Sequence, residues 1–228
     1  MRRTRFKLLF VLSLIMAMAC PALSQKTGTR LDRNSNAPAS VNDAGVNSAI
    51  LVANGFGQCL ARREGKRMRV VLDLPLLAPE QVKGLIRSIE TFDGCLGDSD
   101  EFDQLRSHNI LMIGGAAEYF VGTALKKTDL SSLTGMTDEL LMKTDFRPRT
   151  VLEDLGLCIV RRDVAKSKAL LASMPTSDAE KMAVKAITPE IGPCVSAGAE
   201  LKLNAPNIRA LIAYALYRAA SKLDAKNA

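Results

Sequence analysis

The fold is decided by two stretches of sequence, FGQCLARRE at residues 56–64 and LGLCIVRRD at residues 155–163. The glycine, the cysteine and both arginines are identical in the two stretches, and four of the other five aligned pairs keep their chemical type. Farther along each half, an Asn-Ile pair is followed by a tyrosine, at residues 109–119 and again at 207–217. This self-similarity predicts a duplicated unit.

The cysteines of the two halves are spaced identically. Cys59 precedes Cys95 by 36 positions, and Cys158 precedes Cys194 by 36 positions. We therefore expect two tandem related modules, at residues 45–127 and 149–228, joined by a connector at 128–148. Residues 25–44 contain almost nothing to bury, and we interpret them as a flexible polar tether.

Composition predicts a mainly α-helical fold. The chain has no tryptophan and three tyrosines, and it is rich in alanine and leucine, which favour helices over strands. Apolar periodicity, caps and prolines give the expected helices. They span residues 46–63, 66–74, 79–92, 109–126, 138–142, 151–162, 163–172, 177–187 and 206–223. A short extended pairing at 201–203 is also expected.

The four cysteines of the two predicted modules allow three disulfide pairings. The repeat favours Cys59–Cys95 and Cys158–Cys194, because a duplicated unit inherits its own bridge. Each bridge is expected to contribute about 4 kcal/mol on the chain-entropy model. A zinc site or a redox centre is disfavoured, because the chain has a single histidine and no Cys-x-x-Cys motif. We expect no metal and no cofactor.

The first 24 residues have the pattern of a secretory signal peptide. Four basic residues precede the apolar run at 8–19, which Pro21 ends, and small residues follow before an expected cleavage after Ser24. The run is too short for a membrane span, so no integral anchor is expected after cleavage. A lipoprotein acylated at Cys20 is the less favoured alternative. We expect a periplasmic or secreted protein.

The signal peptide accounts for most of the basic charge. The whole chain carries a formal +7, and without the four basic residues of 1–24 it carries +3. This is an ordinary charge for a soluble domain, and it disfavours a nucleic-acid partner.

Few residues suggest catalysis. His108 is the only histidine, and we expect it in a turn before a helix. The acidic run at 98–103 lacks the glycine and glutamate of a calcium loop. Gly114 and Gly115 are expected to let another helix approach closely.

The repeated arginine pairs are the remaining candidate site. Arg62, Arg63, Arg161 and Arg162 each follow a predicted disulfide cysteine closely, and paired guanidinium groups can bind carboxylate or phosphate. The alternative, which we favour, is that they pair with neighbouring acids or with carbonyls at the end of a helix.

The second half of the chain resembles small uncharacterised exported proteins of Gram-negative bacteria. Residues 157–163, Cys194 and residues 208–218 carry the resemblance, with Val164 departing from an expected proline. The resemblance implies export and helices and supplies no known activity. We expect a non-catalytic interaction or scaffold protein that binds an unknown envelope protein or surface component. The alternatives are an envelope hydrolase that uses His108 and nearby carboxylates, and anion or lipid binding by the arginine pairs.

Overall fold

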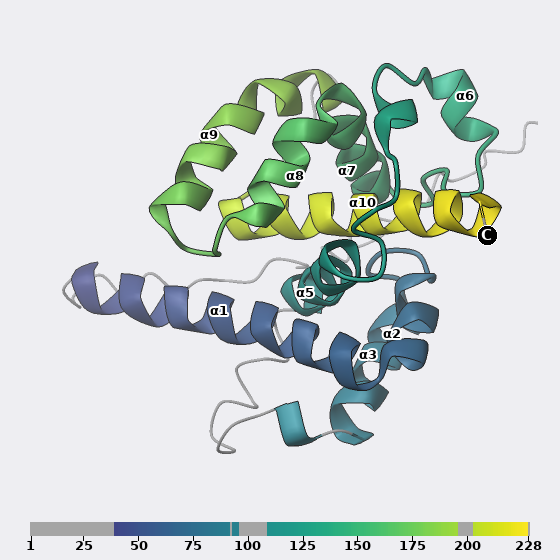
Figure 1. Ribbon diagram of the computed structural model, residues 1–228. Helices are drawn as coiled ribbons and strands as arrows, with labels where there is room; N and C mark the ends of the chain where they lie inside the picture. The colour runs from purple at the N-terminus through teal and green to yellow at the C-terminus, as the bar shows by residue number, and fades with distance from the viewer. Residues whose placement is uncertain (1–38, 92, 96–108, 196–202, 228) are drawn as a thin grey trace, which may run out of the picture. The chain divides into compact units, whose positions relative to one another are not determined.

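The computed structural model describes residues 39–91, 93–95, 109–195 and 203–227 (Figure 1). This part of the chain is mainly helical and contains no β-strand, as composition predicts. The α-helices are α1 (Ala39–Arg63), α2 (Gly65–Leu72), α3 (Pro79–Thr91), α5 (Asn109–Gly122), α6 (Asp138–Met142), α7 (Val151–Arg162), α8 (Val164–Ala172), α9 (Asp178–Ile191) and α10 (Ala205–Asn227). The short 3-10 helices are η1 (Asp93–Cys95), η3 (Ser131–Leu133) and η4 (Gly192–Cys194).

Within the residues that the structure describes, the two halves have the same order of elements. In each half, three α-helices are followed by a 3-10 helix that ends at a cysteine, and a last α-helix comes after it. The connector holds η3 and the expected helix α6. This order is what a duplication predicts, and the duplication itself stays a prediction.

The helix boundaries differ from the predictions at the start of α1 and at the end of α9. Helix α1 begins at Ala39, inside the segment interpreted as a tether, and not at Val46. The added residues 39–45 read ASVNDAG and carry no apolar stripe that sequence periodicity could detect. Helix α9 continues through Pro189 to Ile191 instead of ending near residue 187. The expected extended pairing at 201–203 falls largely outside the described residues.

Side-chain caps start the helices of the second half. Asp163 caps α8 and Ser177 caps α9, as predicted, and Thr150 caps α7 in the same way. In α9 the carboxylate of Glu180 reaches back to the N–H of Thr176 at 2.7 Å. Such bonds satisfy N–H groups that have no partner within the helix.

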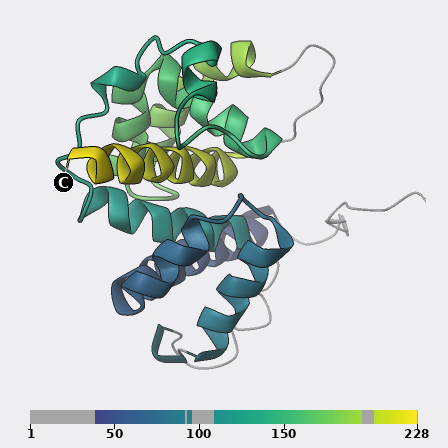
Figure 2. The ribbon, with the colours of Figure 1, turned by 90° about the vertical axis from the view of Figure 1, so that its right-hand side faces the viewer.

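Helix α5 lies between α1 and α10, and α10 also packs against α7 (Figures 1 and 2). Glycines make these close approaches possible. A Cβ at Gly115 would clash with the carbonyl of Asn54 in α1, and a Cβ at Gly114 would lie 2.5 Å from the Cβ of Ala210 in α10. The expectation that this glycine pair admits a neighbouring helix is therefore confirmed on both sides of α5.

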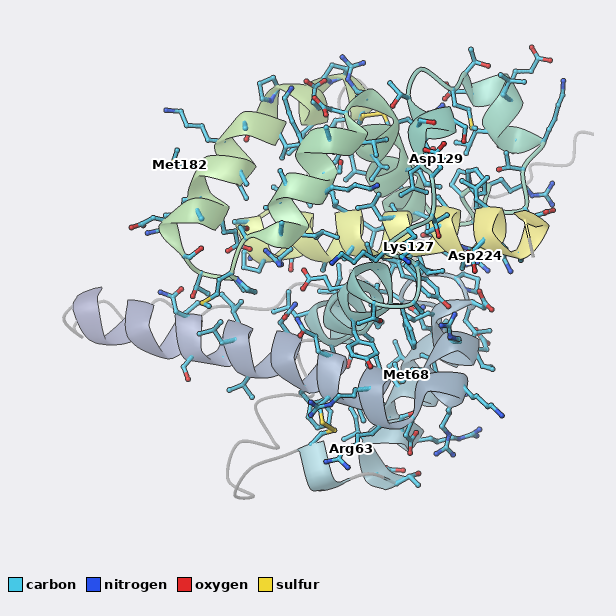
Figure 3. The ribbon with its side chains drawn as sticks, in the orientation of Figure 1. Arg63, Met68, Lys127, Asp129, Met182 and Asp224 are labelled. Carbon is cyan, nitrogen blue, oxygen red and sulfur yellow. A yellow bond between two sulfur atoms is a disulfide. The ribbon has the colours of Figure 1, made fainter. Side chains whose placement is uncertain are left out.

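The two predicted modules share one apolar core. It contains side chains of both halves and of the connector, including Leu60, Leu85, Ile113, Leu133, Leu157, Leu170 and Leu216. The rings of Phe120 and Tyr217 meet across the α5–α10 contact, with centroids 5.7 Å apart. Met68 is fully buried in this core, while Met182 lies on the exposed face of α9 (Figure 3). Because α5 and α10 pack directly, the halves form one compact unit.

None of the helices in the described ranges is long and apolar enough to cross a membrane.

Candidate functional site

Both predicted disulfides are present. Cys59 bonds to Cys95 and Cys158 to Cys194, and each pair has its Cα atoms 5.7 Å apart, within the usual range for disulfides. The first bridge joins α1 to η1, and the second joins α7 to η4. Each bridge thus ties the first helix of its half to the turn that follows the third helix.

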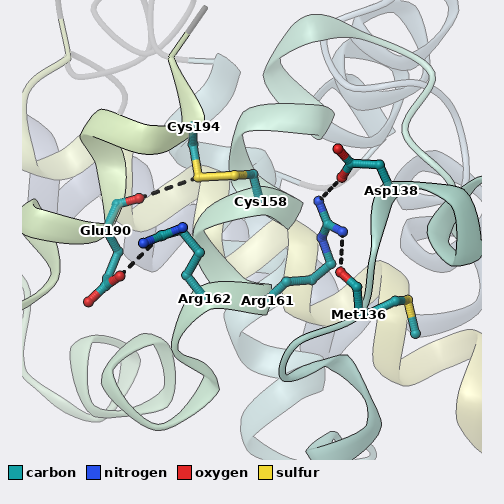
Figure 4. The surroundings of a disulfide bond; sticks show 7 residues. All are labelled: Met136, Asp138, Cys158, Arg161, Arg162, Glu190 and Cys194. Carbon is teal, nitrogen blue, oxygen red and sulfur yellow. Dashed lines mark hydrogen bonds and ion pairs between the residues drawn. A yellow bond between two sulfur atoms is a disulfide. The ribbon is translucent and has the colours of Figure 1, made fainter.

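The second disulfide lies between the two arginines that follow Cys158 (Figure 4). Arg161 is 8 % exposed and donates hydrogen bonds to the Met136 carbonyl and, at 2.6 Å, to the carboxylate of Asp138. Arg162 donates to the carboxylate of Glu190 at 3.1 Å. These two guanidinium groups connect α7 to the connector on one side and to α9 on the other.

The first arginine pair lies at the end of α1, where Arg62 and Arg63 are both exposed. The structure therefore places the two pairs in different surroundings, with the second pair engaged by protein acids. An anion at Arg161 would compete with Asp138 for the guanidinium group. Anion binding by these residues stays a prediction. His108, Asp98, Asp100, Glu101 and Asp103 lie outside the described residues.

A different basic site, which the sequence did not reveal, lies where α2, the connector and α10 meet. We call it the basic pocket, and its volume is ≈ 690 Å³. It is lined by Asp73 after α2, by residues 142–145, 147 and 149 and by Arg218 and Lys222 of α10. Five lining side chains are cationic and two are acidic, so positive charge predominates.

Arg149 forms one wall of the basic pocket and is held by several protein groups. Its guanidinium group donates to the carboxylate of Glu153 at 3.0 Å and to the Tyr214 hydroxyl at 3.1 Å. It also donates to the carbonyls of Asp73 at 2.6 Å and Leu74 at 3.0 Å. These bonds fasten the turn that follows α2 in the first half to the start of the second half.

Glu153 is the buried acid behind this wall, with its side chain 3 % exposed. Burial alone would raise the pKa of this carboxyl, but the hydrogen bonds from Arg149 and from the N–H of Leu76 outweigh it and lower the pKa overall. Burial also raises the pKa of the neighbouring Tyr214 hydroxyl, and the charge of Glu153 adds to that rise. Tyr214 is therefore a neutral phenol that donates to the Leu74 carbonyl at 2.6 Å.

Arg218 lies at the floor of the basic pocket and is only 4 % exposed. Its guanidinium group donates to the Asp73 carbonyl at 3.2 Å. Its Nε is buried and has no hydrogen-bond partner among the described residues. A buried donor without an acceptor is rare, because it loses its bonds to water and gains nothing in return.

A second cluster of buried charged residues lies where α5 packs against α10. Arg209 of α10 pairs with Glu118 of α5 and, at 3.2 Å, with Glu180 of α9. Asn54 and Gln58 of α1 donate to Glu118 as well, each at 3.3 Å. This cluster therefore links the four helices α1, α5, α9 and α10 through hydrogen-bonded polar groups.

Within this cluster, Glu118 has a raised pKa. Burial raises the pKa of its carboxyl above the ordinary value, and the charge and hydrogen bond of Arg209 only partly offset the rise. The physical reason is that removal of this carboxyl from water has a larger effect than its bonds to Arg209, Asn54 and Gln58. Its surroundings include a smaller pocket of ≈ 310 Å³ that is lined in part by Gln58, Glu118 and Arg209.

The sequence contained a signal for some of these residues. Glu118 is the single charged residue in the apolar helix Asn109–Gly122, and Arg209 and Arg218 lie within the apolar part of the last helix. A charge in such a helix indicates a buried partner, because an unpaired buried charge is very costly. The partners themselves come from other helices, so spacing along the chain does not identify them.

No family model, no curated protein and no solved structure matches this chain. Its function has to be inferred from its own residues.

Proposed function

We propose that this chain is an exported interaction or scaffold protein of the bacterial cell envelope that works without catalysis. The observation that carries the proposal is the pair of disulfides, which tie corresponding elements of the two halves. Disulfides persist in oxidising compartments and are rare where thiols are kept reduced. The signal-like pattern of residues 1–24 agrees with export, and the charge of the remaining chain suits a soluble domain.

The way in which the buried charges are used supports a structural role for them. Glu153 accepts hydrogen bonds from the guanidinium group and the backbone N–H of Arg149 and from the N–H of Leu76. Arg209 is bonded to Glu118 and Glu180 and to backbone carbonyls. A catalytic acid or base must come within hydrogen-bonding distance of a substrate proton. Glu153 and Arg209 instead form their hydrogen bonds with groups of other elements of the fold. A rigid body with fixed surfaces suits a protein that binds partners.

Export can be tested in cells by fractionation combined with thiol alkylation. We expect the protein in the periplasm or the medium, shortened by about 24 residues as signal-peptide processing predicts, with all four remaining cysteines protected from the alkylating reagent. A variant that lacks residues 1–24 is the matched control, and it should stay in the cytoplasm with reactive thiols. Full-length, alkylated protein in the cytoplasm of wild-type cells would contradict the proposal.

Interaction can be tested by photo-crosslinking at exposed apolar positions. Val151 and Met182 are 78 % and 73 % exposed, and a crosslinker there reports on different faces of the protein. We expect one face to yield a discrete crosslinked product in intact cells. Lys83, an exposed polar position on α3, serves as the control. The absence of a discrete product from every exposed face would argue against a scaffold role.

A further inference from the structure

We propose that the basic pocket between α2, the connector and α10 binds a phosphate group, carried by a soluble phosphomonoester or by a lipid headgroup. The site is distinct from the arginine pairs near the disulfides. It is built from three parts of the fold that are far apart in sequence, around a space of ≈ 690 Å³. Ligand pockets in proteins commonly have volumes of about 300–1,000 Å³.

Arg218 is the central binding residue. It is 4 % exposed, it lines the pocket, and it keeps a buried Nε without an acceptor among the described residues. A guanidinium group has five N–H donors and cannot lose its charge, so an anion in the pocket would complete its bonding. The Asp73 carbonyl holds the group from one side and thereby limits its movement.

Arg147 and Lys222 supply further positive charge to the pocket. Arg147 is exposed on the connector, and the side chain of Lys222 is 34 % exposed on α10. Lys222 has only a loose ion pair, with its Nζ 3.7 Å from the carboxylate of Asp73. The guanidinium group of Arg149, in contrast, already donates hydrogen bonds to Glu153, Tyr214 and backbone carbonyls. It therefore forms a fixed wall of the basic pocket.

This arrangement favours phosphate over carboxylate. Arg218 and Lys222 of α10 and Arg147 of the connector line the same pocket. A ligand that contacts all three must therefore present oxygen atoms on several sides. A phosphomonoester has three such oxygens and a charge of about −1.5 to −2 at neutral pH. A carboxylate is planar, carries one charge and has two oxygens. The pocket is also larger than one phosphate group, which leaves room for the organic part of the ligand.

The pocket beside the second disulfide is a weaker candidate for the same chemistry. Arg161 also has a buried Nε without a partner, and that pocket measures ≈ 650 Å³. However, Asp138 already neutralises the guanidinium group of Arg161 at 2.6 Å. A phosphate there would have to displace a protein carboxylate, whereas the guanidinium group of Arg218 is hydrogen-bonded to the carbonyl of Asp73 and not to a carboxylate.

The test uses the oxidised full-length protein and measures binding by calorimetry with two probes. Phenyl phosphate represents a soluble phosphomonoester, and vesicles of phosphatidic acid in phosphatidylcholine represent a headgroup. Benzoate and pure phosphatidylcholine vesicles are the controls for charge and surface. We expect phenyl phosphate to bind at least about tenfold more tightly than benzoate, the equivalent of one additional charge-assisted hydrogen bond.

Variants at the pocket make the test specific. Arg147→Ser and Lys222→Ala should each weaken phosphate binding by about tenfold, and Lys185→Ala on α9 should leave it unchanged. Asp73→Asn removes a competing carboxylate and keeps the backbone carbonyl, so it should strengthen binding by about fivefold. A gain in affinity cannot result from damage to the fold. Arg218→Gln should abolish binding. If that variant fails to fold, the variants Arg147→Ser and Lys222→Ala test the proposal in its place.

The outcomes separate the sources of the phosphate. Binding of phenyl phosphate without vesicle binding supports a soluble ligand, and vesicle binding that Arg147→Ser weakens supports a headgroup. Equal affinity for phosphate and benzoate would overturn the proposal. Affinity that none of the pocket variants changes would overturn it as well, and neither result depends on where the protein resides or on its partners.

Discussion

Arg209 of α10 and Glu118 of α5 form an ion pair in the interior, with their side chains 5 % and 7 % exposed and 91 positions apart in the chain. The same guanidinium group also pairs with Glu180, whose side chain is 4 % exposed. One cation thus serves two buried carboxylates at the place where the two halves meet. The burial makes the pair sensitive to the loss of either partner, and the two partners are not equivalent.

Replacing Arg209 with methionine should be far more damaging than replacing Glu118 with glutamine. Arg209→Met leaves two buried carboxylates without their cation and should lower the free energy of unfolding by about 3–5 kcal/mol. Glu118→Gln keeps the shape and leaves Arg209 paired with Glu180, so its cost should be about 1 kcal/mol. Urea denaturation of the two variants measures both values. A larger loss of unfolding free energy for Glu118→Gln than for Arg209→Met would contradict the assignment of one cation to two buried carboxylates.

The pH dependence of stability should show that burial raises the pKa of Glu118. Between its ordinary value of 4.5 and the raised value, the folded protein binds a proton more tightly than the unfolded chain does. The wild-type protein should therefore gain stability relative to Glu118→Gln as the pH falls through this range, and the difference should level off below it. Unfolding free energies of both proteins at a series of pH values test this sign.

Glu153 should show the opposite dependence, because its pKa in the folded protein is lowered. Its contribution is fully present above the ordinary value of 4.5 and is lost as the pH falls through the lowered value. The variant Glu153→Gln should therefore be less stable than the wild type at neutral pH and should approach it in acid. A difference between the two proteins that stays constant down to low pH would rule out this role for the carboxylate.

Removing either disulfide should destabilise the protein to a similar extent. Both bridges have a sequence separation of 36, so the chain-entropy model assigns each about 4 kcal/mol. We expect comparable decreases in unfolding free energy for Cys59→Ala/Cys95→Ala and for Cys158→Ala/Cys194→Ala. Mass spectrometry of the non-reduced protein gives the independent check on pairing. An unchanged unfolding midpoint on reduction would show that the bridges carry no stability.

Two glycines of α1 provide a matched pair for testing helix packing. A Cβ at Gly57 would lie 2.8 Å from the carbonyl carbon of Met112, whereas a Cβ at Gly55 meets nothing within 4 Å. Gly57→Ala should therefore destabilise the fold by about 1–3 kcal/mol. Gly55→Ala should stabilise it by up to about 1 kcal/mol, because alanine favours a helix over glycine. Thermal unfolding of the two variants should shift in opposite directions.

The sequence predicted the elements of this fold well because each of them depends on neighbouring residues. The apolar stripe from Ile208 to Leu223 and the cap at Ser177 are local patterns, and helices were found at both places. The repeated spacing likewise selected the correct disulfides among three pairings. The least accurate boundary was the start of α1, where residues 39–45 carry no apolar pattern to detect.

The amino-acid sequence by itself determined the helical class and the cysteine pairing. Tertiary structure alone decided which distant groups meet: Arg209 with Glu118, Arg149 with Tyr214, and Arg218 with the Asp73 carbonyl. The physical reason is range. Helix formation and capping act over a few residues, whereas Arg218 lies 145 positions from Asp73 and reaches it only after α2 and α10 have packed into one core.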